Sequence, residues 1–192
     1  MFEIATVPEQ FFGAPAFAIR QRQRDLVRKL TGKGDFVVFP ELFTLQLLSI
    51  EDQELSPAES IEALTKYTPR FKDALRDMAL RYNINIIGGS HPVVRDGGIY
   101  NTAHLFTPSG SVYTQEKLHI TPAERSAGDI LPGESIRIFN TPLARIAIQV
   151  CYDIEFPEIS RLLTLAGVEV VFVPFYTEEK KAYYRVRHCA QA

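Results

Sequence analysis

Cysteine is scarce in this sequence, because among 192 residues only Cys151 and Cys189 carry a thiol. Two cysteines are too few for a disulfide framework, and no spacing of Cys and His along the chain is typical of a zinc site. Free thiols persist in a reducing compartment. We therefore expect a cytoplasmic protein without a structural metal, in which a cysteine is available for chemistry.

Excess charge of one sign and long apolar runs are also lacking. The formal net charge of -2 excludes a general attraction to nucleic acid or to anionic membrane. No apolar run approaches the roughly 20 residues that a membrane helix requires. The N-terminus, Met1 to Ala5, begins directly as a strand-like segment without the regions of a signal peptide. Because no repeat or linker interrupts the chain, we expect one domain over residues 1–192.

Strand-like segments occur throughout the chain. They cover residues 36–39, 84–88, 100–107, 111–118, 145–150 and 168–173. The first and last of these are short apolar runs typical of buried strands. In residues 145–150 the apolar side chains alternate, which places Ile146, Ile148 and Val150 on one face. Residues 100–107 and 111–118 flank a Pro-Ser-Gly turn and predict a hairpin.

Helix-like segments lie between these strands. They cover residues 16–30, 69–82, 157–165 and 181–192. Thr68 is a candidate N-cap for the second helix, while Pro157 opens the third and Gly167 ends it. Residues 121–135 are rich in Pro, Gly and charge, which predicts a loop over a site or a sheet edge. Strands that alternate with helices predict an α/β fold.

Three side chains with chemical potential follow predicted strands. Cys151 stands between the strand over residues 145–150 and the helix that Pro157 opens, where a nucleophile is accessible. Glu41 follows the buried strand 36–39, and Lys117 ends the hairpin strand. Taken singly, each has a structural interpretation: a buried cysteine, a helix cap and an edge-strand lysine. Their common position at strand ends is what favours a shared site.

Three sequence blocks around these residues resemble the nitrilase (carbon-nitrogen hydrolase) superfamily, whose members carry a Glu-Lys-Cys triad in that chain order. The blocks are Asp35-Phe36-Val37-Val38-Phe39-Pro40-Glu41, then Tyr100-Asn101-Thr102-Ala103 leading through Gly110 to Lys117-Leu118-His119, then Cys151-Tyr152-Asp153 with Phe156-Pro157-Glu158 and a strand ending at Pro174. The similarity extends from about residue 35 to the end of the sequence.

This resemblance implies a four-layer α-β-β-α sandwich in which two sheets pack face to face between helices. It implies hydrolysis of an amide or carbamoyl group in a small molecule, or less often of a nitrile, with no metal or organic cofactor. Members of the superfamily commonly form homodimers, often through the helix that follows the nucleophile. Relatives continue with further helix and strands beyond the position of Ala192, so we expect a C-terminal portion to be missing.

The resemblance also implies a role for each site residue. Cys151 is the expected nucleophile, Glu41 its general base, and Lys117 the group that favours the thiolate and stabilises an oxyanion together with the Tyr152 backbone N–H. Glu124 resembles a second glutamate that holds Lys117 and orients substrate, unless it is a solvated loop carboxylate. Glu155 replaces an arginine of many relatives. It either favours an amine-bearing substrate or forms a surface ion pair.

Three other interpretations are open from the sequence. Cys151 can pair with a histidine, as in a Cys-His hydrolase, and the candidates are His91, His104, His119 and His188. A non-catalytic binding or regulatory module with the same fold is a second possibility. Arginines in the helix over residues 16–30 allow a nucleic-acid surface, although a solvated helix face is the ordinary interpretation.

Overall fold

The chain forms two β-sheets in the computed structural model, which describes residues 4–6, 35–50, 55–127, 130–177 and 180–191. In the larger sheet the strand order is β1-β2-β3-β4-β5, and β6 pairs with β4. These strands are β1 (Ile4–Thr6), β2 (Phe36–Val38), β3 (Asn85–Arg95), β4 (Gly98–Phe106), β5 (Val112–Glu116) and β6 (Ile130–Leu131). The pairs β1–β2 and β2–β3 are parallel, while β3–β4 and β4–β5 are antiparallel. The predicted hairpin is therefore confirmed as β4–β5.

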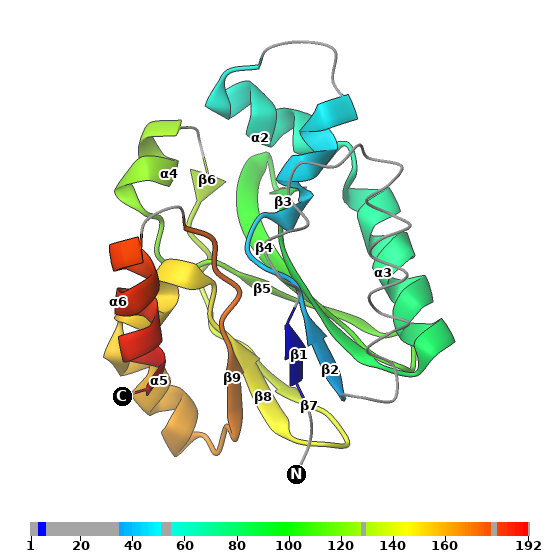
Figure 1. Cartoon of the computed structure of the whole chain (residues 1–192), viewed down its shortest axis with the longest axis vertical. Coiled ribbons are helices and arrows are strands. Elements are labelled where there is room, and N and C mark those ends of the chain that lie inside the picture. Colours follow the sequence, from blue (N-terminus) through cyan, green and yellow to red (C-terminus); the bar gives the residue numbers. More distant parts are fainter. Residues whose placement is uncertain (1–3, 7–34, 51–54, 128–129, 178–179, 192) are drawn as a thin grey trace.

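The smaller sheet has the order β7-β8-β9 and packs against one face of the larger sheet (Figure 1). Its strands are β7 (Ile138–Asn140), β8 (Arg145–Ile148) and β9 (Val170–Phe172). Ile146 and Ile148 of β8 face the larger sheet, while Ala147 between them faces the opposite side. The alternation predicted for this strand is confirmed.

Helices cover the outer face of each sheet, so the layers follow the order α-β-β-α (Figure 1). On the larger sheet lie α2 (Pro57–Thr65), α3 (Thr68–Tyr82) and the short 3₁₀ helix η2 (Phe43–Ile50), and on the smaller sheet lie α5 (Pro157–Leu165) and α6 (Lys180–Gln191). Three apolar clusters fill the spaces between the four layers. The predicted four-layer architecture is confirmed.

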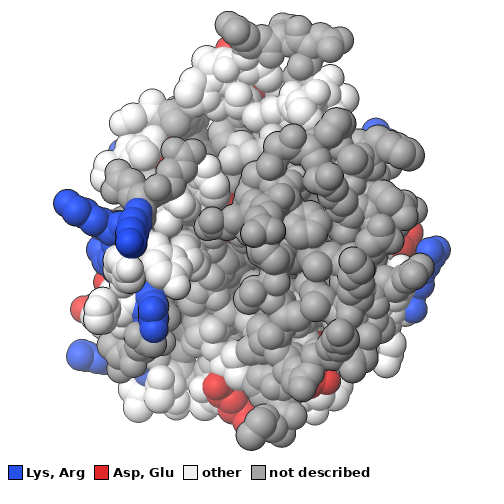
Figure 2. Space-filling model, in the orientation of Figure 1, with Lys and Arg blue, Asp and Glu red and all other residues white. Residues whose placement is uncertain are grey.

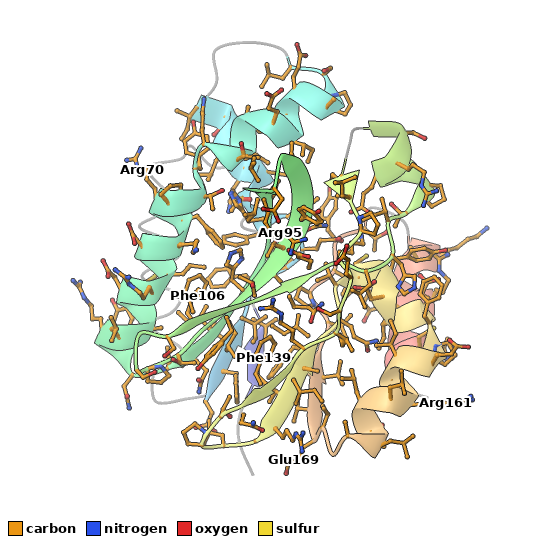
Figure 3. The ribbon with its side chains drawn as sticks, turned by 180° about the vertical axis from the view of Figure 1, so that it is seen from behind. Arg70, Arg95, Phe106, Phe139, Arg161 and Glu169 are labelled. Carbon is orange, nitrogen blue, oxygen red and sulfur yellow. The ribbon has the colours of Figure 1, made fainter. Side chains whose placement is uncertain are left out.

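Neighbouring residues of the same strand belong to different apolar clusters. Phe106 of β4 packs toward Phe71 of α3, whereas Leu105 belongs to the cluster between the sheets together with Phe139 of β7. Figure 3 shows Phe106 near α3 and Phe139 between the two sheets. Because both faces of the strand are buried, its sequence is a nearly continuous apolar run at this end.

The start of α3 differs from the prediction. Thr68 is already helical and Tyr67 is the capping residue, without a side-chain cap. The Thr68 hydroxyl instead donates to the backbone oxygen of Thr65 at 2.7 Å and lies 2.9 Å from Nε2 of His91. Since α2 ends at Thr65, this hydroxyl joins the two helices and is not available as a cap. The prediction of Thr68 as the N-cap is wrong.

The segment predicted as a loop over residues 121–135 contains regular structure. It includes the short helix α4 (Pro122–Ala127) and strand β6. Thr121 Oγ1 accepts from the Glu124 backbone N–H at 3.1 Å, and Glu124 Oε2 accepts from the Thr121 backbone N–H at 2.9 Å. This reciprocal capping box stabilises the start of a helix. The loop prediction is therefore wrong for residues 122–127 and 130–131.

Helix α6 is strongly basic on its exposed side. It carries Lys180, Lys181, Arg185 and Arg187, all of them exposed. Figure 2 shows Lys and Arg side chains along the side of the molecule where Figure 1 places this helix. The predicted basic helix over residues 16–30 lies outside the described residues. In the part of the chain that the structure describes, no helix is long and apolar enough to cross a membrane.

Candidate active site

Glu41 is held in place by a close contact between the segment after β2 and a bulge in β3. Gly89 in this bulge has φ +56°, and a Cβ atom there would meet the backbone oxygen of Pro40 at 2.0 Å. The next residue, Ser90, accepts a 3.0 Å hydrogen bond from the backbone N–H of Leu42. Only glycine allows this approach. The bulge therefore fixes the backbone on both sides of Glu41.

Lys117 directly follows β5 and is fixed by backbone hydrogen bonds on two sides. Its N–H donates to the backbone oxygen of Asn101 in β4 at 2.9 Å, and its carbonyl oxygen accepts from Gly133 N–H at 2.8 Å. The side chain is 1% exposed. A fully buried ammonium needs paired negative charge, which excludes the role of a solvated edge-strand lysine.

Cys151 is the third residue after the end of β8 and the first residue of the 3₁₀ helix η3 (Cys151–Glu155). Its backbone N–H donates to the carbonyl oxygen of Pro174 at 2.9 Å, and its φ is +49°. A non-glycine residue in the left-handed region is strained by about 1–3 kcal/mol and is often found at functional sites. The predicted position between a strand and the α5 helix is confirmed.

The three side chains meet between the sheets, together with Glu124. Lys117 Nζ lies 2.8 Å from Oε1 of Glu41 and 2.8 Å from Oε2 of Glu124. The thiol of Cys151 lies close enough to Glu41 and Lys117 for the charges of both to shift its pKa. Glu41 and Lys117 come from the larger sheet and Cys151 from the smaller one. The fold therefore brings together the three residues predicted from strand ends.

Charges in this cluster are strongly coupled. Burial by itself disfavours the ammonium of Lys117, but the charges of Glu41 and Glu124 overcome this effect and raise its pKa above the ordinary value. Burial likewise disfavours the Glu124 carboxylate, yet the ammonium of Lys117 and hydrogen bonds from Lys117 and Thr121 lower its pKa. Lys117 and Glu124 are therefore charged at neutral pH.

The surroundings of the Cys151 thiol favour its neutral form. Burial and the negative charge of Glu41 raise the pKa of Cys151 well above the ordinary thiol value, and the positive charge of Lys117 offsets only part of this effect. Cys151 therefore rests as a neutral thiol whose proton faces a carboxylate. Such a thiol needs a base at the moment of attack.

Asp153 joins the segment before Cys151 to the segment after Lys117. Its fully buried carboxylate accepts from the backbone N–H groups of Val150, Leu118 and His119, and from Nδ1 of the His119 ring at 3.0 Å. Burial raises the pKa of Asp153, and these hydrogen bonds work against that rise. Asp153 belongs to the third of the sequence blocks, but no pattern in the sequence indicates this role.

Two predicted supporting residues lie near the cysteine in different surroundings. Tyr152 follows Cys151 in η3, and its ring packs edge-on against Phe156 with centroids 5.2 Å apart. Glu155 Oε1 accepts a 2.7 Å hydrogen bond from Nε of Arg185 on α6. The structure therefore places Glu155 in an ion pair, which is the ordinary one of its two interpretations.

The candidate histidines of a Cys-His hydrolase have other partners. His91 contacts Thr44 and Thr68, and His104 contacts the backbone oxygen of Thr102. His119 pairs with Asp153 and stacks on the ring of Phe156, with centroids 3.6 Å apart. His188 lies on the exposed side of α6. These contacts favour structural roles for the first three histidines.

Sequence reasoning missed Asn101, whose amide nitrogen contacts both Glu41 and Glu124. Its strand position was predicted, but an asparagine at a buried strand position carries no signal that names its partners. The position of Glu124 at the start of a helix did have a sequence signal, because Thr121-Pro122-Ala123-Glu124 is a capping-box sequence. Among the described residues, no group of three or more His, Cys, Asp and Glu side chains is arranged to hold a metal ion.

Comparison with known proteins agrees with this geometry. A family model described as Carbon-nitrogen hydrolase matches residues 20–192. The chain is 48% identical over 160 residues to the probable hydrolase YhcX of Bacillus subtilis strain 168, with 83% of this chain and 31% of that protein covered. It is 28% identical over 165 residues to the omega-amidase NIT2 of Danio rerio, with 80% and 56% covered.

A solved structure shows the same fold. An amidase from Nesterenkonia sp. matches with a TM-score of 0.77 at 20% identity, and the match covers 95% of this chain and 68% of that one. The chain spans between about a third and just over a half of the length of the two curated relatives.

Proposed function

Because the chain belongs to the carbon-nitrogen hydrolase family of the nitrilase superfamily, we propose that it hydrolyses a non-peptide C–N bond in a small amide or carbamoyl substrate through a thioester on Cys151. The observation that carries this proposal is the buried ion pair of Glu41 with Lys117 beside the thiol of Cys151, whose pKa the charges of both residues shift. Three side chains of different chemistry, from two sheets, converge on one point.

The first half-reaction forms the thioester. Glu41 takes the proton of Cys151 while Sγ attacks the carbonyl carbon and the C=O electron pair moves onto oxygen. Lys117 stabilises this oxyanion, and we assign the Tyr152 backbone N–H as a second donor. Glu41 then gives its proton to the departing ammonia or amine as the C–N bond breaks. The charge of the cluster is unchanged when the proton moves from Cys151 to Glu41, which favours this transfer in a buried site.

The second half-reaction releases the acid. Glu41 takes a proton from water as the water oxygen attacks the thioester carbon, Lys117 again holds the oxyanion, and the C–S bond breaks. Sγ regains the proton from Glu41, which restores the resting thiol. Glu124 keeps the ammonium of Lys117 in place through its 2.8 Å ion pair. No metal or organic cofactor takes part in the proposed reaction.

Amides are the favoured substrate class. In a solved mutant of the amidase from Nesterenkonia sp. AN1, the acetamide moiety of fluoroacetamide is covalently added at the active-site cysteine. The adduct keeps its amide group, so it supports a site in which a small amide lies next to the cysteine. Carbamoyl groups present the same C–N bond to the thiol, and nitriles are the less favoured alternative.

An ammonia-release screen tests this function. Short ω-amides, N-carbamoyl amines and simple nitriles are offered to the chain, and released ammonia is measured. Cys151→Ala is expected to abolish release, and Glu41→Gln to lower it on the order of 100- to 10,000-fold. Cys189→Ala is the matched control and keeps the activity, because Cys189 lies on α6, where it lines a pocket with Pro157 and Leu165 of α5. Release that survives Cys151→Ala contradicts the mechanism, and no release from any class favours a non-catalytic binding module.

Pairing of two copies through α5 is a further part of the proposal. Leu162 and Leu165 of α5 are 60% and 85% exposed, and Tyr183 of the adjacent α6 is also exposed. Burying such apolar surface against a second copy is favourable. Light scattering on the eluting chain is expected to give a dimer, and Leu165→Glu a smaller species. A wild-type monomer at micromolar concentration contradicts the pairing.

The compartment and the domain organisation also remain proposals. Both cysteines are free thiols, so we propose the reducing cytoplasm as the location. We likewise propose that residues 1–192 act as one domain.

A further inference from the structure

The side chain of Asn101 lies between the two carboxylates of the candidate site. Its Nδ2 donates to Oε1 of Glu41 at 3.0 Å and to Oε1 of Glu124 at 3.1 Å. The residue is fully buried, and its backbone oxygen accepts from the N–H of Lys117. Asn101 therefore contacts all three charged members of the cluster, either through its amide group or through its backbone.

The orientation of this amide follows from its neighbours. A rotated amide would place Oδ1 against two carboxylate oxygens, which have no proton to share. With Nδ2 facing the carboxylates, Oδ1 is buried and makes no hydrogen bond within the described residues. A buried carbonyl without a donor is unfavourable, so the two charge-assisted hydrogen bonds on Nδ2 have to outweigh it.

The two oxygens of Glu41 consequently have different surroundings. Oε1 accepts from Lys117 Nζ at 2.8 Å and from Asn101 Nδ2 at 3.0 Å, and neither donor group can accept a proton in return. Oε2 accepts from the backbone N–H of Tyr176 at 3.2 Å. A proton on Oε1 would displace one of two good donors. Protonation of Oε2 by the thiol is therefore less unfavourable in free energy than protonation of Oε1.

We propose that Asn101 is a positioning residue which, with Lys117, keeps Oε1 of Glu41 occupied, so that Glu41 exchanges the proton of Cys151 through Oε2. This inference rests on the proposed function of Glu41 as the base. Asn101 touches neither the thiol nor the reacting carbon in this scheme. Among the charged and titratable groups near Glu41, Lys117 forms an ion pair with it, Cys151 interacts with its charge, and Glu124 shares Lys117 and Asn101 with it.

The pH profile of Cys151 alkylation tests the positioning role of Asn101. Iodoacetamide is the probe, the extent of labelling at Cys151 is measured by peptide mass spectrometry, and rates are taken from about pH 5 to about pH 8. A base that already carries a proton cannot accept one from the thiol, so the rate of a base-assisted thiol falls toward acid pH; this fall is the acid limb of the profile. A carboxylate that loses an N–H donor holds a proton more tightly. Asn101→Leu therefore moves this acid limb to higher pH, by about one unit.

A matched control is present in the same sheet. Asn85 of β3 is also a buried asparagine with an unpartnered Oδ1 among the described residues, and its Nδ2 donates to the backbone oxygen of Asp35. It lies seven residues along β3 from Pro92, the strand partner of Asn101. Asn85→Leu removes the same groups from a buried site away from the cluster, so its acid limb stays at the wild-type pH.

Two further variants separate the outcomes. Asn101→Asp keeps the shape of the side chain and places a third carboxyl group against Glu41 and Glu124, so its limb also moves to higher pH. The inference is overturned if the acid limb stays at the wild-type pH in both Asn101→Leu and Asn101→Asp. It is also overturned if neither of these variants folds while Asn85→Leu does. Glu41→Gln is expected to remove the limb. A limb that persists in Glu41→Gln shows that the proposed role of Glu41 has failed, which is a different result from an unmoved limb in the Asn101 variants.

Discussion

The carboxylate of Asp153, two residues after Cys151, accepts a 2.7 Å hydrogen bond from the backbone N–H of His119, two residues after Lys117. The cysteine and lysine segments belong to different sheets and are 34 residues apart at this contact. A buried carboxylate with four N–H donors thus fixes the spacing of the proposed nucleophile and the proposed oxyanion donor.

Asp153→Asn is expected to loosen this connection. The amide presents its own N–H groups to backbone N–H donors, so at least one buried donor loses its acceptor, at a cost on the order of 3 kcal/mol of unfolding free energy. Urea unfolding measures the change. Asp77→Asn on the exposed side of α3 is the control and stays within about 0.5 kcal/mol of the wild type. Equal stability of the two variants contradicts the role given to Asp153.

Removal of the buried ammonium is expected to damage both activity and stability. Lys117→Met takes away the oxyanion donor, which lowers ammonia release on the order of 100- to 1,000-fold. It also leaves Glu41 and Glu124 buried without their cation, which costs about 3–5 kcal/mol of unfolding free energy. Lys181→Met on exposed α6 changes neither quantity. If the Lys117→Met chain keeps its activity and its stability, the proposed role of the Lys117 ion pairs in catalysis and folding is wrong.

Acidification is expected to destabilise the chain through His91. The Thr68 hydroxyl donates to Thr65, which assigns the proton of His91 to Nε2 and leaves Nδ1 to accept from Thr44. Burial lowers the pKa of His91 from 6.5 to about 4, so between these values the unfolded chain binds a proton that the folded chain does not. The contribution of His91 to the free energy of unfolding is therefore fully present above pH 6.5 and is lost as the pH falls toward 4.

The variant His91→Gln isolates this contribution. Between these two pH values the variant loses less unfolding free energy than the wild type does, because glutamine does not titrate. The two losses are expected to differ by on the order of 3 kcal/mol. Urea unfolding at a series of pH values gives the difference. Parallel curves for the two chains show that His91 does not resist protonation in the folded state.

A methyl group at Gly89 is expected to displace Glu41. The Cβ of Gly89→Ala meets the Pro40 oxygen, and both the bulge and the segment that carries Glu41 have to move. Ammonia release should fall at least tenfold, since misplacement of a catalytic group by about 1 Å costs up to about 100-fold. Gly97→Ala is the control. Gly97 also has a positive φ, +79°, but no atom lies within 4 Å of the added carbon, so the catalytic rate is kept.

The strands and the α/β class followed from apolar runs bounded by turn residues, and the position of Glu41, Lys117 and Cys151 at strand ends favoured a shared site. The four-layer arrangement and the role of each of these residues came from the resemblance to the nitrilase superfamily. The capping box of α4 also had a sequence signal, which the richness in Pro and charge obscured. The partners of Asn101 had none. Its contact with Glu41 spans 60 residues and depends on the register of β4 against β3 and on the bulge at Gly89, and no local pattern encodes either.

The raised pKa of Cys151 was likewise not readable from sequence. A neighbouring lysine suggested a thiolate, but the balance depends on how deeply the thiol is buried and on how close Glu41 lies. Both quantities arise only when the two sheets pack. The roles of Glu124, Tyr152 and Glu155 in catalysis remain predictions.

Alkylation of the two cysteines in one sample tests the central claim, that Glu41 serves Cys151 as its base. A thiol without a base reacts with iodoacetamide about tenfold faster for each unit by which the pH rises toward its pKa, because only the thiolate reacts. For Cys151 we predict a rate that is nearly constant between about pH 6.5 and about pH 8, and a fall in that rate in Glu41→Gln. A tenfold rise per pH unit at Cys151, unchanged by Glu41→Gln, contradicts the account.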